Sequence, residues 1–478
     1  MVNTQQTLAQ VVFIPSPGMG HIIPMVELAK KFVSHHNIGV TFLIPTLFPP
    51  SEAQESLLQT LPPKISHVSL PQADMGSLSP KNTKMHILII LSVVKSLDFI
   101  RKELQLMVDS GSRLTAVVAD LFAVDCIDVA KEFNAAPYIF FWSSAMVVST
   151  FYYLPKLHEM VDCEYRELDH PIEVPGCRPI PALDLFDSLQ DRKDEAYKWM
   201  LHFAKKYHQA DGLIVNSFME LENGPLKALQ DPQAEYPPVY AVGPLVSSDG
   251  VGKDNKECMD WLDGQPPASV LYVSFGSAGN LTVEQITELA FGLEMSGQRF
   301  LWVTRKPVDK KAEMAVDETD RFDFLPEGFL DRTKDRGLIV DSWAPQQKIL
   351  CHGSTGGHLT HSGWNSGLES IVNGVPLIAW PMFAEQKMNA FLMTEDAGIA
   401  LRPRRCPETG LIGREEISKV VANLMEGDVG KAVRERMNCL KIAAAKALSE
   451  DGASDKTVAQ VVSEFKIENP MKLPKDSN

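Results

Sequence analysis

The chain has 478 residues, of which 45% are hydrophobic and 22% charged, and a formal net charge of −15. At about 100–200 residues per domain, this length predicts two domains or one large α/β domain, with the composition of a globular protein. The acidic balance argues against nucleic acid or an anionic membrane surface as the main partner.

Apolar runs alternate with helix-like segments through the first half of the chain. A strand at 10–14 leads into a Pro/Gly loop and an amphipathic helix, and further strands are predicted at 38–46, 114–122 and 136–145. Strands and helices that alternate across short loops are typical of a parallel, doubly wound sheet.

The same plan recurs in the second half. Residues 268–297 form a strand, a Gly/Ser loop and a helix, and further strands are predicted at 299–305, 337–343, 356–361 and 376–381. The segment 242–257, rich in Gly, Ser and charge, is typical of a linker, and the charged stretch 307–323 indicates a surface insertion. The pattern therefore predicts two Rossmann-like domains that face each other across a cleft.

The cysteines and the hydrophobic segments indicate the cellular compartment. Seven cysteines are scattered without a C-x-x-C pair, which favours reduced thiols over a disulfide framework or a zinc site. The first ten residues do not have the pattern of a secretory signal, and the longest apolar stretch, 87–94, is far shorter than the ~20 residues that span a bilayer. We expect a soluble, cytoplasmic protein without membrane insertion.

Ligands of open parallel sheets bind outside the carboxyl ends of the strands, so the loops after the predicted strands are the places to look for chemistry. These loops contain Ser16 to His21, Asp120, Ser277, Trp343 to Gln346, His361 to Ser366, Glu385 and Gln386.

The loop after the strand at 356–361 opens a helix that Asn373-Gly374 ends, and it suits a phosphate. The free N–H groups at the start of a helix bind anions. Gly363 removes a side chain where a phosphate must approach, Asn365 and Ser366 add donors, and His361 adds a donor or a positive charge. The alternative, that Ser366 and Glu369 form only a capping box, leaves His361 and the neighbouring tryptophan unexplained.

Other loop residues suit the remaining parts of a sugar nucleotide. Trp343 can stack on a base, Gln346 can read the edge of that base, and Glu369 can accept hydrogen bonds from ribose. Glu385 and Gln386 offer acceptors and a donor for sugar hydroxyls. Taken singly, a tryptophan is more often a core residue and a polar pair is often a solvated loop.

A longer comparison of motifs points to one family. The segment "WAPQQKILCHGSTGGHLTHSGWNSGLESIVNGVPLIAWPMFAEQ" at 343–386 resembles the signature box of plant family 1 UDP-sugar glycosyltransferases. "IPSPGMGHIIPMVELAK", "VVADLF", "QDRKDEAYKW" and "SVLYVSFGS" are similar to the phenol- and hydroquinone-glucosylating (arbutin-forming) branch of that family. The resemblance implies a GT-B fold, a UDP-sugar donor and inversion at the anomeric carbon.

By the same resemblance, residues 1–245 are the acceptor-binding domain, 246–256 the linker, 257–458 the UDP-sugar-binding domain, and 459–478 a segment that packs back on the first domain. Gln386 at the end of the box favours UDP-glucose. The donor residues implied by matching position are Ser277, Trp343, Ala344, Gln346, His361, Gly363, Trp364, Asn365, Ser366, Glu369, Glu385 and Gln386.

Two residues of the box depart from the usual family pattern. Ser362 stands where the family commonly has cysteine, a near-isosteric change. His358 stands where an aromatic or aliphatic residue is usual, and we expect it to fill the strand rather than take a catalytic role.

His21 and Asp120 follow two strands of the first half and can form a base. Because an imidazole titrates close to neutral pH, His21 can accept the proton of an acceptor hydroxyl while Asp120 holds its other ring nitrogen. Taken alone, His21 is more often a plain loop residue and Asp120 a turn or cap residue; their positions after strands and the resemblance reverse that reading. Without a D-x-D motif, we expect neither a metal nor any other cofactor.

The acceptor pocket is expected among less regular segments, including 183–186. Its candidates are Met19, His86, Phe122, Phe141, Trp142, Met146 and Ala384. The sequence thus predicts a monomeric enzyme that moves glucose from UDP-glucose to the hydroxyl of a small aromatic acceptor (a phenol, hydroquinone, monolignol or indoxyl-like compound), or alternatively one that acts on flavonoids or aromatic amines.

Three other classes fit less well. A dinucleotide-dependent oxidoreductase needs G-x-G-x-x-G and an acid about 20 residues later, but "GMGHII" lacks the third small residue and the strand at 38–46 ends without an acid. A GT-B phosphorylase or a UDP-sugar epimerase does not explain the complete box. A non-catalytic sugar-nucleotide binding protein has no need of both His21 and Asp120.

Overall fold

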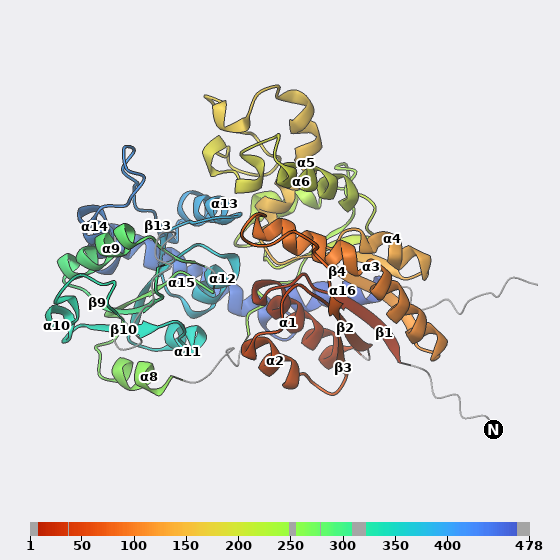
Figure 1. The fold of residues 1–478 in the computed structure, drawn as a ribbon, viewed down its shortest axis with the longest axis horizontal. Helices are drawn as coiled ribbons and strands as arrows, with labels where there is room; N and C mark the ends of the chain where they lie inside the picture. Colours follow the sequence, from red (N-terminus) through yellow and green to blue (C-terminus); the bar gives the residue numbers. More distant parts are fainter. Residues whose placement is uncertain (1–7, 37, 248–254, 278, 308–321, 466–478) are drawn as a thin grey trace, which may run out of the picture.

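The computed structural model describes residues 8–36, 38–247, 255–277, 279–307 and 322–465. Two parallel sheets form two halves that lie side by side, one from each half of the chain (Figure 1). These are the two doubly wound, Rossmann-like domains that the alternating pattern predicts, and they agree with the GT-B fold that the family resemblance implies. Of the predicted linker 246–256, residues 248–254 lie outside the described residues, as do 308–321 of the predicted insertion.

The N-terminal sheet has the order β3-β2-β1-β4-β5-β6-β7, with every neighbouring pair parallel. Its strands are β1 (Ala9–Ile14), β2 (Ile38–Thr46), β3 (Ile65–Gln72), β4 (Arg113–Asp120), β5 (Ala136–Phe141), β6 (Gly212–Val215) and β7 (Val239–Ala241). Its helices are α1 (Met19–His35), α2 (Glu52–Gln59), α3 (Met85–Asp109), α4 (Cys126–Glu132), α5 (Ala145–Met160), α6 (Glu195–Tyr207) and α7 (Asn223–Leu229).

The C-terminal sheet has the order β10-β9-β8-β11-β12-β13 and is also parallel. Its strands are β8 (Val270–Ser274), β9 (Arg299–Thr304), β10 (Gly337–Asp341), β11 (Thr355–Thr360), β12 (Leu377–Ala379) and β13 (Ala400–Leu401). Its helices are α8 (Lys256–Asp263), α9 (Val283–Ser296), α10 (Phe329–Thr333), α11 (Gln346–Cys351), α12 (Trp364–Asn373), α13 (Gln386–Phe391), α14 (Arg414–Met425) and α15 (Asp428–Leu448).

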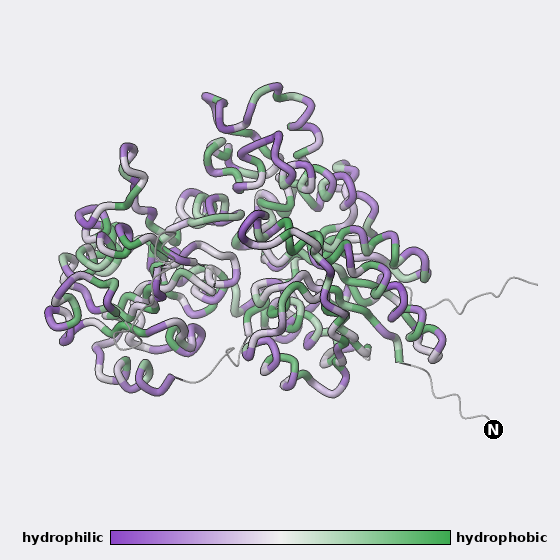
Figure 2. Tube along the Cα trace, in the orientation of Figure 1, coloured by the Kyte–Doolittle hydropathy of each residue, from purple (hydrophilic) through white to green (hydrophobic). Residues whose placement is uncertain are grey.

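The central strands are apolar throughout because both faces of each sheet are covered by helices. In β1, Val11 and Phe13 belong to one buried cluster, while Val12 and Ile14 belong to the cluster on the opposite face. Figure 2 shows the hydrophobic stretches running through the middle of each half and hydrophilic stretches on the outer turns. No helix in the described part of the chain is long and apolar enough to cross a membrane.

The chain returns to the N-terminal half at its end. Helix α16 (Ala453–Glu464) lies along that half, and its residues pack in the same cluster as β1 and α1 (Figure 1). The Ser454 hydroxyl donates to the Val242 carbonyl oxygen, and Phe465 packs on Phe32 and Tyr138. The helix that packs on the N-terminal half begins at Ala453, and residues 466–478 of the predicted C-terminal segment lie outside the described residues.

Candidate active site

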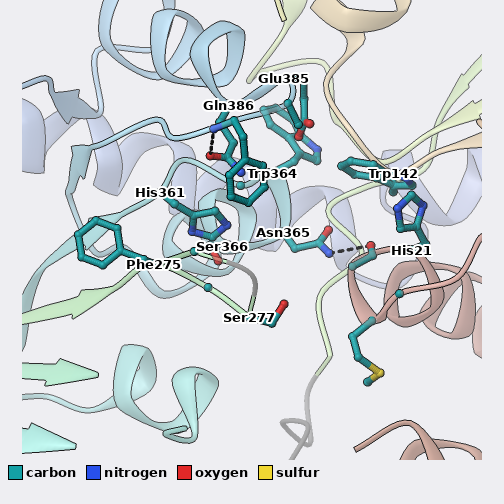
Figure 3. A pocket seen from close by; sticks show the side chains of 18 of the residues that line it. His21, Trp142, Phe275, Ser277, His361, Trp364, Asn365, Ser366, Glu385 and Gln386 are labelled. Atoms are coloured by element: carbon teal, nitrogen blue, oxygen red, sulfur yellow. Dashed lines mark hydrogen bonds between the residues drawn. The ribbon is translucent and has the colours of Figure 1, made fainter. Parts of the chain in front are cut away.

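A cavity of about 850 Å³ lies between the two halves. Its walls are the loops after β1 and β5 on one side and the loops after β8, β9, β10, β11 and β12 on the other. Figure 3 shows His21 and Trp142 on one wall and Ser277, His361 and Ser366 on the other. This volume is within the usual range for sites that take small organic ligands.

His21 and Asp120 form the pair that the sequence predicts. His21 Nδ1 lies 3.0 Å from Asp120 Oδ2; the His21 side chain is 12% exposed and the Asp120 side chain is fully buried. The other carboxylate oxygen, Oδ1, accepts from the Ser16 hydroxyl at 2.6 Å and from the Phe122 amide at 3.0 Å. The carboxylate is therefore held from three sides, and it fixes one ring nitrogen of His21.

Aromatic rings surround the other side of His21. The ring centroid of Trp142 is 4.9 Å away and that of Phe122 is 5.6 Å away. The neighbouring Ser143 hydroxyl is buried and has no hydrogen-bond partner among the described residues. An imidazole between aromatic walls can meet a flat apolar molecule that carries a hydroxyl.

Most of the predicted acceptor residues line this cavity, but Met146 does not. The lining includes Met19, His86, Phe122, Phe141, Trp142 and Ala384. On α5 it is Val147 and Phe151 that line the cavity, because neighbouring helix positions point in different directions and Met146 faces the core. In the segment 183–186, Phe186 lines the cavity whereas the Leu183 side chain is 66% exposed.

Helix α12 presents its amino terminus to the cavity. Gly363 is the N-cap residue and makes no side-chain cap, so Ser366 is the third residue of the helix and cannot form the capping box. Gly374, with φ of 77°, ends the helix as the Asn-Gly pair predicts. The free amides of the first turn and the Ser366 hydroxyl remain near the cavity as donors for an anion.

His361 occupies the space that two glycines leave. A Cβ atom on Gly363 would lie 2.4 Å from His361 Nε2, and one on Gly276 would lie 2.5 Å from His361 Cε1. The sequence prediction that Gly363 makes room for a phosphate is therefore incomplete, since the glycine also makes room for the imidazole. Burial lowers the pKa of His361 to about 4, so it is a neutral donor at neutral pH when no anion is bound.

Hydrogen bonds connect Gln346, Ser366 and Glu369 on the wall of the cavity that the C-terminal half forms, which we call the donor wall. Gln346 Nε2 donates to Ser366 Oγ at 3.0 Å and to Glu369 Oε2 at 2.5 Å. Burial raises the pKa of Glu369, while the hydrogen bond from Gln346 opposes that shift. Trp343 is 40% exposed, and both Trp343 and Ala344 line the cavity.

Two residues of α12 are already hydrogen-bonded to the N-terminal half. The Trp364 indole N–H donates to the Asn216 carbonyl at 2.7 Å, so it is not available to a sugar, although the ring lines the cavity. Asn365 Nδ2 donates to the Gly20 carbonyl at 3.1 Å, next to His21 (Figure 3). In this structure the two side chains connect the two halves, so their donor groups are already used within the protein.

Glu385 and Gln386 lie above His361 in Figure 3 and line the cavity. Burial raises the pKa of Glu385, whose Oε1 accepts from Asn389 at 3.1 Å. Gln386 Oε1 accepts from the amides of Met382 and Phe383 at 2.9 and 3.1 Å, which leaves its Nε2 for a ligand.

His358 fills the sheet, as we expected. It is fully buried in β11, its ring stacks on Tyr272 at 4.9 Å, and its Nδ1 lies 2.9 Å from the Ser370 hydroxyl. Burial, with a smaller effect of His361, lowers its pKa to about 3. Ser362, the other departure, is buried with φ of 65°, and its carbonyl accepts from Asn389.

Two residues of the site, Ser143 and Arg305, escape the sequence analysis, which also names Ser16 only as part of a loop. Ser16 bonds Asp120, the buried Ser143 follows Trp142 on the wall of the cavity, and Arg305 joins two loops of the donor wall. Only position signals them, since each comes at or after the carboxyl end of a strand. Among the described residues, no group of three or more His, Cys, Asp or Glu side chains is placed to hold a metal ion.

Two Rossmann-like domains with a His–Asp pair opposite the amino terminus of a helix fit the class of GT-B glycosyltransferases. Residues 241–421 match the family model described as UDP-glucoronosyl and UDP-glucosyl transferase. Hydroquinone glucosyltransferase of Rauvolfia serpentina is 52% identical over 456 residues, which cover 94% of this chain and 96% of that protein. UDP-glycosyltransferase 72B1 of Arabidopsis thaliana is 52% identical over 465 residues, 95% of this chain and 96% of that protein.

Solved structures agree over nearly the whole chain. UGT2 of Phytolacca americana, complexed with UDP-2-fluoro-glucose and pterostilbene, has a TM-score of 0.88 and 46% identity, covering 95% of this chain and 99% of that one. A UDP-glucosyltransferase of Polygonum tinctorium that glucosylates indoxyl, in complex with 3,4-dichloroaniline, has a TM-score of 0.89 and 46% identity, covering 96% and 99%. The chain belongs to the UDP-glucosyl transferase family and is a UDP-sugar-dependent glycosyltransferase.

The buried imidazole of His358 predicts a pH dependence of stability. Its pKa is about 3 in the fold and about 6.5 when unfolded, so the unfolded chain binds the extra proton and stability falls as pH drops below about 6.5. His358→Phe keeps the stacking and removes the titration. Between about pH 7.5 and 5.5, the unfolding free energy of the wild type should fall by about 1.4 kcal/mol more than that of His358→Phe, as measured by urea titrations. His170→Phe, at an exposed site, is the control; an equal loss in His358→Phe and wild type contradicts the prediction.

Proposed function

We propose that the protein is an inverting glucosyltransferase that moves glucose from UDP-glucose to the hydroxyl of a small aromatic acceptor. The observation that carries the proposal is the His21–Asp120 pair, 3.0 Å apart, on the wall opposite the amino terminus of α12. A base and a site for an anionic leaving group on opposite walls suit a displacement in which the nucleophile attacks the face away from the departing group.

His21 is proposed to act as the general base through Nε2. An ionised Asp120 carboxylate can only accept, so it favours the tautomer with hydrogen on Nδ1 and leaves Nε2 free to take a proton. The acceptor oxygen forms its bond to C1 of glucose as His21 takes the proton, and the bond from C1 to the diphosphate oxygen breaks. Such a base typically contributes ~10²–10⁴-fold to the rate.

The donor is proposed to lie along the other wall. Uracil stacks on Trp343 and meets Gln346 and the Ala344 backbone, ribose binds Glu369, and the diphosphate lies at Ser277, His361, Ser366 and the first turn of α12. The helix terminus stabilises the charge that develops on UDP as it leaves. Glu385 and Gln386 are proposed to bind the sugar, with Gln386 Nε2 as the donor that favours glucose.

Small aromatic acceptors are favoured by the rings around His21 and by the similar proteins. These include a hydroquinone glucosyltransferase, an enzyme that glucosylates indoxyl and an enzyme in complex with pterostilbene, and all three compounds are aromatic. A phenol, with a pKa of about 10, gives up its proton more readily than an alkyl alcohol.

The proposal needs neither a metal ion nor a further cofactor, because amides, hydroxyls and His361 are available to the diphosphate. We also propose a monomer in the cytoplasm. One chain supplies both walls of the cavity, and all seven cysteines are free thiols, which suits a reducing compartment.

An acceptor screen tests the proposal as a whole. UDP-glucose is offered with simple phenols, hydroquinone, monolignols, indoxyl, flavonoids and chloroanilines, and products are identified by mass spectrometry and by the anomeric coupling in NMR spectra. We expect β-glucosides of the small phenols. Transfer confined to flavonoids or to the amine of chloroanilines would replace the proposed acceptor class.

His21→Ala is expected to lower kcat for phenols by about a hundredfold or more while the Kd for UDP stays within about twofold of wild type. The reason is that His21 touches the acceptor and not the nucleotide. His170→Ala, which removes an exposed histidine, is the control. An equal loss of UDP affinity, measured by calorimetry, would move His21 out of the role of base.

Gln386→His is expected to lower kcat/KM for UDP-glucose by about tenfold, because it removes the Nε2 donor and frees the amides of Met382 and Phe383. UDP affinity should change little. The control is Gln209→His at an exposed site, and the measurement is the rate with UDP-glucose, UDP-galactose and UDP-xylose. An unchanged donor profile rules out the assigned role of Gln386.

A further inference from the structure

Arg305 lies on the donor wall, between the loops that follow β8 and β10. It follows β9 directly, and the strand order places β9 between β10 and β8. Its Nη1 donates to the carbonyl oxygens of Gly276 at 2.9 Å and Ser277 at 2.7 Å, and its Nη2 donates to the carbonyl of Ser342 at 3.1 Å. One guanidinium therefore joins the loop after β8 to the loop after β10, and both loops line the same wall of the cavity.

The backbone of both loops is bent towards this side chain. Gly276 has φ of 71° and Ser342 has φ of 64°. The left-handed conformation is unfavourable for a serine, so something must hold Ser342 in it. Hydrogen bonds from a charged donor are stronger than neutral ones, and a planar guanidinium can reach several carbonyls at once. The position of Arg305 is thus set by three bonds before any ligand arrives.

Those bonds leave the charge of Arg305 unpaired. No carboxylate lies within salt-bridge distance of it in the part of the chain that the structure describes. Two of its five N–H groups, on Nε and Nη2, have no hydrogen bond to a described residue. An unpaired, half-buried cation is costly without an anionic partner, and burial indeed lowers the pKa of Arg305, although Asp341 opposes that effect.

Arg305 is also the only full positive charge on this wall. Among the described residues that line the cavity, Lys84 and Arg305 are the only lysine or arginine, and Lys84 pairs with Asp194 on the acceptor side. His361 is neutral at neutral pH before an anion binds, because burial lowers its pKa to about 4. The wall also carries Glu369 and Glu385. A multiply charged diphosphate therefore meets one permanent cation here.

We propose that Arg305 supplies the positive charge that recognises the diphosphate of the donor nucleotide, with its guanidinium held in place by the carbonyls of Gly276, Ser277 and Ser342. The inference rests on the proposed use of a UDP-sugar and adds a residue that the signature box does not contain, because Arg305 lies before residue 343. The charge stabilises bound UDP and, by the same interaction, the negative charge that grows on UDP as the sugar leaves.

Nucleotides of increasing charge test this role separately from catalysis. Calorimetry measures the Kd of uridine, UMP and UDP for wild type, Arg305→Gln and Arg305→Lys. The matched control is Lys306→Gln, because Lys306 is exposed, carries the same charge one residue later and does not line the cavity. Thermal melting of each variant reports on folding, and Arg305→Met is a second neutral variant should Arg305→Gln not fold.

We expect Arg305→Gln to weaken UDP binding by about ten- to a hundredfold, to weaken UMP binding less, and to leave uridine binding within about twofold. Arg305→Lys keeps the charge and should recover part of the UDP affinity. Raising the salt concentration should weaken UDP binding more in wild type than in Arg305→Gln.

Two results would overturn the inference. If Arg305→Gln weakens uridine and UDP by the same factor, Arg305 only holds the loops; if neither changes, it has no part in donor binding. Both results concern nucleotide binding alone. A failure of the proposed function appears instead as a wild-type enzyme that binds UDP and transfers no glucose to aromatic hydroxyls.

Discussion

The site depends on a buried hydrogen bond between the two halves, from the Trp364 indole to the Asn216 carbonyl at 2.7 Å. The proposed base and the proposed leaving-group site belong to different halves of the chain, and they can act together only if the two halves keep a fixed spacing. Asn216 also accepts, through its side-chain oxygen, the amide of Leu245 at 2.7 Å, near the start of the linker. Asn216, which follows β6, therefore connects α12 to the segment at Leu245 that leads into the second half.

The segment after Asn216 also holds the acceptor wall. Both carboxylate oxygens of Glu222 accept amides from the first turn of α5, at 2.8 Å each, and the Ser217 hydroxyl donates to the same carboxylate. Burial raises the pKa of Glu222 to about 7, because a buried carboxylate loses the hydration that stabilises its charge. The three hydrogen bonds from Ser217, Ala145 and Met146 stabilise the charged form and oppose that shift. Helix α5 carries Val147 and Phe151 to the cavity, so both walls are fastened to one short stretch of chain.

The sequence shows the fold and the broad site more readily than the geometry inside the site. Long buried strands such as β1 and β2 stand out as apolar runs, whereas β7 and β13, with three and two residues, are too short to produce a pattern. His21, Asp120 and the donor loop are visible because they follow strands. The sequence does not show which partner a side chain bonds or which way it points. Trp364 donates its indole N–H to Asn216, and Met146 faces the core while Val147 faces the cavity.

Asn365 shows why such details decide how the site works. Its side chain donates to the carbonyl of Gly20, the residue before His21, so the first turn of α12 is tied to the loop that carries His21. Its own side-chain oxygen is buried without a partner among the described residues. A displacement of α12 would stretch or break this hydrogen bond to the backbone next to His21. The bond thus connects the first turn of α12 with the loop of His21, although the two belong to different sheets and lie far apart in the sequence.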